Sequence, residues 1–283
     1  MIFFCMFVIN CKRICLAVAF GTVFALATAQ SEQQAALLRK AYDEQSTDLL
    51  FEFFNNWSEE VQSNETEAHN PYVAEAHKVY AAFYQPLQPE KIGFGFEKDT
   101  YKDMPFFIVQ GSLYEISLTK HIPKKWGDKT FRKILPVTTL DSAVEFRPPV
   151  HFNGKKIVYL SDGYKKLLDN FFREKRAEFG FYSENQVFDS LQTEEDLIDE
   201  MLTHEFQVQN EMLEFIRKAA MVERGHWVGW QYETYPTARQ IIFNSKMTRA
   251  VVLFQFIYRG GEAIMEKRHG KWLIVDGHFT WIM

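Results

Sequence analysis

The chain has few cysteines, and all three, Cys5, Cys11 and Cys15, lie within the first 29 residues. Residues 30–283 contain none, which excludes disulfide bonds, a cysteine nucleophile and thiolate metal ligands from that part of the chain.

The sequence also lacks a run of basic residues. It has 32 Lys and Arg against 37 Asp and Glu, a formal net charge of −5, and this becomes −7 when residues 1–29 are left out. Proteins that bind nucleic acids concentrate positive charge on one surface. We therefore expect no nucleic-acid partner.

Complete catalytic and metal-binding motifs are missing as well. His204-Glu205 begins like the zinc-binding helix of a metalloprotease, but Val208 stands where the second histidine is needed. Gly93 and Gly95 precede no recognisable helix, so they do not predict a phosphate loop. No Gly-x-Ser-x-Gly nucleophile elbow is present. We expect no metal site and no cofactor.

Residues 1–29 have the three parts of a secretory signal. Lys12-Arg13 is followed by an apolar run, Ile14 to Ala29, and this run ends in the small-residue cleavage pattern Ala27-Thr28-Ala29. The run is shorter than the roughly 20 residues that a membrane span needs. We predict export to the periplasm or the medium after cleavage near Ala29. An uncleaved signal segment is the alternative, and the only membrane attachment that we expect.

Hydrophobic periodicity divides the remainder into blocks. Residues 30–91 place apolar side chains at helical spacing, with Ser46 or Thr47 capping one helix and Asn70-Pro71 beginning another. Residues 92–160 contain four to six short period-2 runs broken by Gly and Pro, which predict a β-rich block, either a small domain or an insertion. Residues 161–283 predict further helices and then a sheet. The predicted class is α+β, with helices packed on a bent C-terminal antiparallel sheet.

The last 36 residues predict three strands joined by two tight turns. Gly260-Gly261 is a strong signal for a two-residue hairpin turn, since both residues tolerate positive φ. This turn places Phe256 opposite Met265. A second turn at His269-Gly270 pairs Arg268 with Lys271 and, further on, Ala263 with Asp276. Two more strands, His226 to Glu233 and Arg239 to Phe243, make about five antiparallel strands in all.

Alternation along these strands predicts one aromatic face with two ionisable groups near one end. Its members include Phe254, Phe256, Tyr258, Trp272, Asp276 and His278. An acid beside an imidazole is suited to proton transfer, so Asp276 and His278 are the candidate catalytic residues. The aromatic residues, together with His226 and Trp230 from the segment HWVGW, are the candidate binding residues.

The stretch TRAVVLFQFIYRGGEAIMEKRHGKWLIVDGHFTWI resembles the closing strands of the nuclear transport factor 2-like superfamily, which includes ketosteroid isomerase and scytalone dehydratase. The features that carry the resemblance are a long strand, the Gly-Gly pair and Gly270-Lys271-Trp272-x-Ile274. It implies a strongly bent sheet that wraps around helices and forms a cone with an apolar pocket. The whole chain also resembles uncharacterised exported proteins of Bacteroidetes, and that likeness implies no activity.

Three functions follow as hypotheses. The favoured one is a non-enzymatic binding or interaction module that takes a small apolar or glycan-like ligand, or a protein partner, on the aromatic face. The second is a pocket enzyme of the isomerase or dehydratase type that uses Asp276 and His278. The third is a structural or assembly module that dimerises through the other face of the sheet.

Overall fold

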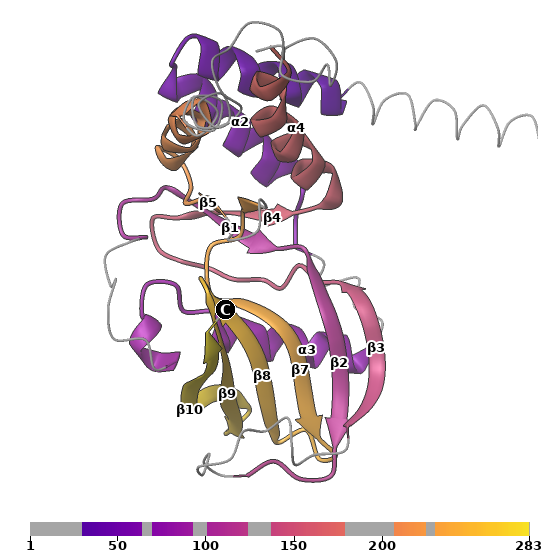
Figure 1. Cartoon of the computed structure of the whole chain (residues 1–283). Helices are drawn as coiled ribbons and strands as arrows, with labels where there is room; N and C mark the ends of the chain where they lie inside the picture. Colours follow the sequence, from indigo (N-terminus) through magenta and orange to yellow (C-terminus); the bar gives the residue numbers. More distant parts are fainter. Residues whose placement is uncertain are drawn as a thin grey trace, which may run out of the picture.

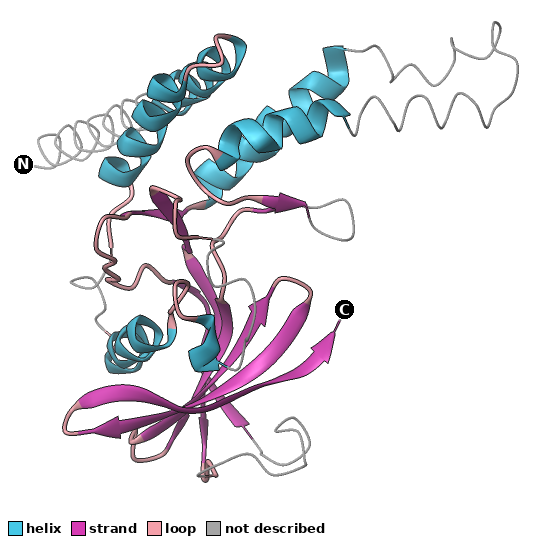
Figure 2. Ribbon diagram, turned by 90° about the vertical axis from the view of Figure 1, so that its left-hand side faces the viewer, coloured by secondary structure: helices cyan, strands magenta, loops and turns pink. Residues whose placement is uncertain are grey.

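The computed structural model describes residues 30–63, 70–92, 101–123, 137–178, 207–224 and 230–282. These residues form two layers (Figure 1), a group of helices at one end and a six-stranded sheet at the other, with small two-stranded sheets between them. Figure 2 shows the twist of the large sheet and the helix that lies against it. The predicted α+β class is confirmed.

The large sheet has the strand order β10-β9-β8-β7-β2-β3. Strands β7 to β10 form an antiparallel meander, while β2 pairs with β7 in parallel and with β3 antiparallel. The bounds are β2 Ser112–Thr119, β3 Val137–Glu145, β7 Thr237–Asn244, β8 Arg249–Phe256, β9 Arg259–Arg268 and β10 Lys271–Ile282. The predicted C-terminal antiparallel sheet is therefore present, and two strands of the β-rich middle block belong to it.

The turn between β8 and β9 does not lie at Gly260-Gly261, where the sequence predicted it. Strand β8 ends at Phe256, the turn is made by Ile257 and Tyr258, and Arg259 pairs with Phe256. Ile257 adopts a positive φ of 53°. Gly260-Gly261 lies inside β9, so the prediction of a Gly-Gly turn is wrong.

Gly261 serves a different purpose, because it leaves room for a neighbouring ring. A Cβ on Gly261 would clash with the ring of Phe254 and would come within 2.6 Å of the backbone oxygen of His278. The true register puts Arg259 opposite Phe256, where Met265 was predicted, a slip of six positions. Because six is even, the side chains of β8 and those of β9 after the glycines keep their predicted faces, whereas Arg259, predicted on the other face, lies opposite Phe256.

The second hairpin follows the prediction at its turn and departs from it later. His269 and Gly270 both have positive φ, and Arg268 pairs with Lys271 as predicted. An extra residue, Val275, then forms a β-bulge, so Asp276 lies opposite Ile264 and not opposite Ala263. A bulge reverses the faces of the residues that follow it.

Helix α3, Pro71–Phe83, covers one face of the sheet, which we call the inner face. Asn70 caps the helix as predicted: its side-chain oxygen accepts a hydrogen bond from the backbone N–H of Tyr72 at 2.9 Å. The ring of Phe83 packs 5.4 Å from the ring of Phe254 on β8. The Glu75 carboxylate accepts a hydrogen bond from the indole N–H of Trp272 on β10 at 2.7 Å. The inner face is thus packed against a helix, and we call the opposite side the outer face.

The other layer contains a helix over residues 30–43, α2 (Thr47–Glu60), α4 (Asp162–Glu178) and a helix over residues 207–217. Ser46 caps α2 as predicted, accepting a bond from the N–H of Leu49. Trp57 stacks on Tyr164 of α4 with ring centres 4.3 Å apart. Within the described ranges, no helix has the length and apolar character that crossing a membrane requires.

Short elements connect the layers. Strand β1 (Phe106–Gln110) pairs in parallel with β4 (Lys156–Leu160), and β5 (Glu223–Arg224) pairs with β6 (Trp230–Gln231). The 3-10 helix η2, Pro89–Ile92, lies against β10. The buried side chain of Gln110 acts like a piece of strand: its oxygen accepts from the N–H of Ala238 at 2.6 Å, and its nitrogen donates to the Ala238 carbonyl at 2.9 Å. These bonds fix the start of β7.

Candidate functional site

Three of the predicted binding residues are packing residues of the core. Phe254 and Phe256 are each 2% exposed and Trp272 is 5% exposed. Phe254 packs on Phe83, Phe256 lies 5.5 Å from the ring of Tyr235, and Trp272 lies 6.0 Å from the ring of Phe243. Side chains of this protein therefore occupy the space in front of these rings.

The other predicted binding residues lie elsewhere. Tyr258 is 40% exposed in the β8–β9 turn and its hydroxyl donates to the Arg224 carbonyl at 3.2 Å. Trp230 in β6 stacks on Phe172 of α4 with ring centres 4.0 Å apart. His226 lies outside the described residues.

Asp276 and His278 share a face, but it is the outer face and not the aromatic one. The bulge at Val275 is the reason, and the prediction that both residues accompany the inner aromatic rings is wrong. Burial lowers the pKa of His278, and the nearby Asp276 carboxylate opposes this shift. His278 stands opposite Glu262 in the β9–β10 ladder.

This ladder position is one member of a row that crosses the whole sheet on its outer face. Consecutive pairings join residues from β3, β2, β7, β8, β9 and β10 in that order. The row consists of Ser142, Glu115, Gln240, Leu253, Glu262 and His278. Five of the six residues are polar. The neighbouring row on the outer face, across β7, β8 and β9, carries the apolar side chains of Ile242, Val251 and Ile264.

A hollow of about 390 Å³ opens over the middle of this row. It is lined by Tyr114, Arg239, Gln240, Leu253, Phe254, Gly261, Glu262 and Thr280. Phe254, one of the predicted binding residues, and Gly261 belong to the inner face by their register. Tyr114 contributes a ring that is 75% exposed, and Glu262 a carboxylate whose residue is only 2% exposed. Polar groups from three different strands, β7, β9 and β10, and one exposed ring from β2 therefore converge on one concave region.

Two β-bulges shape the hollow. Arg239 is the extra residue between the paired positions Ala238 and Gln240 of β7, and Thr280 is the extra residue between Phe279 and Trp281 of β10. A bulge turns a side chain out of the regular alternation and is common beside functional sites. Here the bulges bring the Arg239 and Thr280 side chains to the rim of the same hollow.

Hydrogen bonds hold the floor of the hollow in one arrangement. The side-chain nitrogen of Gln240 donates to Glu115 Oε1 at 2.9 Å and to Ser117 Oγ at 3.0 Å. Glu115 Oε1 also accepts from the hydroxyls of Thr139, at 2.9 Å, and of Ser117. The Thr280 hydroxyl donates to the Gly260 carbonyl at 3.3 Å. The polar groups are thus positioned before any ligand arrives.

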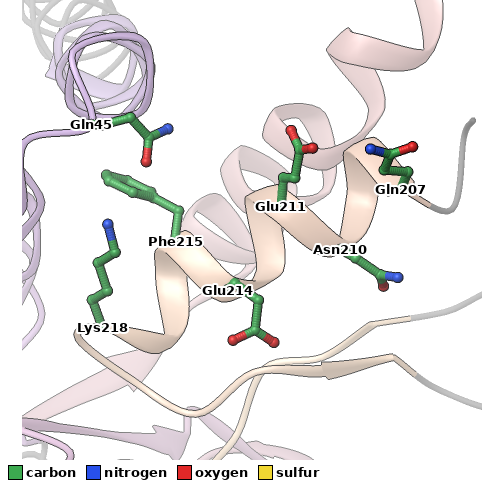
Figure 3. Close-up of a pocket in the computed structure, with 7 residues that line it drawn as sticks. All are labelled: Gln45, Gln207, Asn210, Glu211, Glu214, Phe215 and Lys218. Atoms are coloured by element: carbon green, nitrogen blue, oxygen red, sulfur yellow. The ribbon is translucent and has the colours of Figure 1, made fainter.

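A larger hollow, of about 820 Å³, lies in the helical layer (Figure 3). Its side chains come mainly from the helix over residues 207–217 and spread around that helix: Glu211 and Glu214 point in opposite directions and only Phe215 and Lys218 approach Gln45. Its polar groups do not converge, so we regard the outer-face hollow as the better candidate site.

A metal centre has no support in the described ranges, where no three His, Cys, Asp or Glu side chains are grouped closely enough to hold an ion.

Sequence reasoning identified none of the residues Tyr114, Arg239, Gln240 and Glu262 as a site. The signal for them is weak: each belongs to a strand, but β2 and β7 are far apart in sequence, and a bulge leaves no mark in the pattern of hydrophobic residues.

No protein-family model, curated protein or solved structure matches this chain. The resemblance to the nuclear transport factor 2-like superfamily and to exported Bacteroidetes proteins therefore stays a prediction.

Proposed function

We propose that this protein is a non-enzymatic binding module that takes a small ligand into the outer-face hollow. The observation that carries the proposal is the pair of bulges, at Arg239 and Thr280, which turn polar side chains into one concave region beside the exposed ring of Tyr114. A volume of about 390 Å³ lies within the usual range for small-molecule sites, roughly 300–1,000 Å³.

Catalysis has less support than binding. Neither Asp276 nor His278 lines the hollow. The two carboxylates of the polar row, Glu115 and Glu262, are three strands apart, which at about 4.8 Å per strand is roughly 14 Å. Paired carboxylates that cleave glycosides stand at most about 9.5 Å apart. Glu115 is moreover engaged by three hydrogen-bond donors within the sheet.

We further propose that the ligand is met outside the cytoplasm, because residues 1–29 carry a secretory-signal pattern. Intact-mass measurement of the protein recovered from the periplasm or medium should give a chain that begins near Gln30. Recovery of the uncleaved chain in the membrane fraction would favour the anchored alternative.

The binding proposal is tested by screening the purified protein against neutral saccharides, polyamines, fatty acids and sterols while its melting temperature is recorded. A ligand at a hundred times its Kd stabilises the folded state by about 2.7 kcal/mol, which is measurable as a rise in Tm. Leu253→Trp, which fills the hollow, should abolish that rise. The matched control is Leu273→Trp, since Leu273 lies on the outer face but not in the hollow.

Equal loss of binding in both variants would contradict the hollow as the site. A protein that no compound stabilises, and that light scattering shows to be a stable dimer, would instead favour the assembly hypothesis.

A further inference from the structure

The side-chain amide of Gln240 is oriented by its partners on the sheet. Its nitrogen donates to Glu115 Oε1 and to Ser117 Oγ, and because these two oxygens are hydrogen-bonded to each other, they share one N–H of the amide. The reversed orientation would set the amide oxygen against the Glu115 carboxylate, which is repulsive. Because Gln240 lines the hollow, its oxygen is left to act there as an acceptor whose direction is fixed.

The other polar groups of the hollow add more acceptors. Glu262 brings a carboxylate, which accepts only. Thr280 gives its hydroxyl hydrogen to the Gly260 carbonyl, so toward a ligand its oxygen acts as an acceptor. Donors are also present, because Tyr114 carries a hydroxyl and Arg239 a guanidinium, which also donates to the side-chain oxygen of Gln255. A ligand that fits must offer several donors and a few acceptors close together.

Charge and shape restrict the chemical class of the ligand further. An apolar ligand would strip water from the partly exposed Gln240 and Thr280 and give no hydrogen bond in return, which is unfavourable. An anion would face the Glu262 carboxylate and the Gln240 oxygen, and a cation would face the Arg239 guanidinium. Hydroxyl groups both donate and accept without charge. The exposed ring of Tyr114 offers a flat apolar surface at the edge of this polar set.

We propose that the ligand of the outer-face hollow is a neutral saccharide, with Gln240 as the residue that selects a ring hydroxyl and Tyr114 as the platform on which the apolar face of the sugar ring lies. This inference rests on the proposed function and names its ligand class. Gln240 contacts the ligand, whereas Glu115 and Ser117 are positioning residues that act through Gln240.

The test uses isothermal titration calorimetry on the purified protein with neutral saccharides, namely glucose, galactose, N-acetylglucosamine, cellobiose and lactose, and with spermidine and oleate as the cationic and apolar probes. We expect at least one saccharide to bind, and Tyr114→Ala to weaken it by about tenfold. Tyr114 is exposed, so this variant should keep its fold. Leu273→Ala, on the same face outside the hollow, should bind as the unaltered protein does.

The role of Gln240 is tested with deoxy analogues of the saccharide that binds. Removing the hydroxyl that Gln240 accepts from should weaken binding to the unaltered protein by about tenfold, the effect of one hydrogen bond to a partly buried group. Gln240→Leu should bind the deoxy analogue and the complete saccharide equally well, because this variant has no amide oxygen to accept a hydrogen bond from the hydroxyl. Urea unfolding of Gln240→Leu checks that the variant is folded before titration.

The outcomes separate this inference from the function on which it rests. Binding of spermidine or oleate that Leu253→Trp abolishes, with no saccharide bound, overturns the saccharide inference and leaves the binding module standing. No binding by any probe overturns both. If neither Tyr114→Ala nor Leu253→Trp changes the affinity for a saccharide, that saccharide binds elsewhere, and this outcome also overturns the inference.

Discussion

The Glu75 carboxylate ties α3 to the far edge of the sheet, and its removal is the sharpest test of how the inner face is held. Glu75 is 7% exposed and accepts hydrogen bonds from the Trp272 indole at 2.7 Å, from Lys78 at 3.2 Å, and from Lys267. Trp272 and Lys267 lie in the hairpin of β9 and β10, nearly 200 residues after Glu75. One side chain therefore links α3 to the C-terminal hairpin of β9 and β10.

The cost of Glu75→Ala follows from what it leaves behind. The Trp272 indole N–H is buried and would lose its acceptor, which costs about 2 kcal/mol. The Lys267 side chain is 29% exposed and partly rehydrates, so its loss adds about 1 kcal/mol. We expect about 3 kcal/mol in all, or a fall in Tm of roughly 6–12 °C for a chain of this size. Glu75→Gln keeps an acceptor for the indole and should cost about 1 kcal/mol.

The assay is urea unfolding, in which the midpoint should fall at unchanged m-value. Glu214→Gln is the matched control, since Glu214 is a surface carboxylate paired with Arg217 at 2.7 Å, and its loss should cost less than about 0.5 kcal/mol. If Glu75→Ala unfolds at the same urea concentration as the control, the hydrogen bonds of Glu75 do not stabilise the packing of α3 on the sheet and the reasoning fails.

The pH dependence gives a second measurement on the same residue. Burial alone would raise the pKa of Glu75, but the hydrogen bonds from Lys267, Trp272 and Lys78 outweigh it, and the pKa is lowered from its ordinary value of 4.5. The folded state thus holds the proton less tightly than the unfolded state. The stabilisation is complete above pH 4.5 and is lost as the pH falls through the folded-state pKa. The difference between the protein and Glu75→Gln should shrink over that range.

Three further predictions concern stability. Both ring nitrogens of His77 are buried without a hydrogen-bond partner in the described structure, and burial lowers the pKa of His77 to about 4. The free energy of unfolding should therefore fall by about 3 kcal/mol between pH 6.5 and 4. Acid titration of His77→Leu should lack this loss. Gly261→Ala should lower the free energy of unfolding by about 1–3 kcal/mol because its Cβ meets backbone and ring. Gly163→Ala, in helix α4, should raise it by about 0.5–1 kcal/mol, because its Cβ meets only Ser161 Oγ, at an ordinary contact distance of 3.8 Å. Gln110→Leu leaves both backbone groups of Ala238 without these hydrogen bonds and should lower the free energy of unfolding by about 2–4 kcal/mol, with hydrogen exchange at Ala238 rising first. An unchanged midpoint in Gly261→Ala or Gln110→Leu, or the same acid-induced loss of stability in His77→Leu as in the unaltered protein, would contradict the reasoning.

Local features of the fold could be predicted because they are written in neighbouring residues. Ser46 and Asn70-Pro71 mark helix starts by capping chemistry, and both helices begin there. The turn at His269-Gly270 formed where the residues with easy positive φ stand. The faces of β8 and of β9 after the glycines were also correct, because alternation survives any even slip in register.

Features that depend on distant partners could not be predicted. Gly260-Gly261 has turn chemistry, but the ring of Phe254 requires the space above Gly261, and that demand is visible only in three dimensions. The bulge at Val275 adds one residue without changing the hydrophobic pattern and moves Asp276 to the other face. The candidate site inherits this difficulty, since its hollow depends on two more bulges and on the pairing of β2 with β7.

That parallel pairing has a consequence for how the protein is made. Glu115 on β2 and its neighbour Gln240 on β7 are 125 residues apart. At about 5–20 residues per second, a ribosome needs roughly 6–25 s to synthesise the interval. During that time the nascent β2 has an open hydrogen-bonding edge, which invites pairing with other chains. Shielding of this edge, by a chaperone or by the passage of an unfolded chain through a translocation channel, would matter most in the interval before β7 emerges.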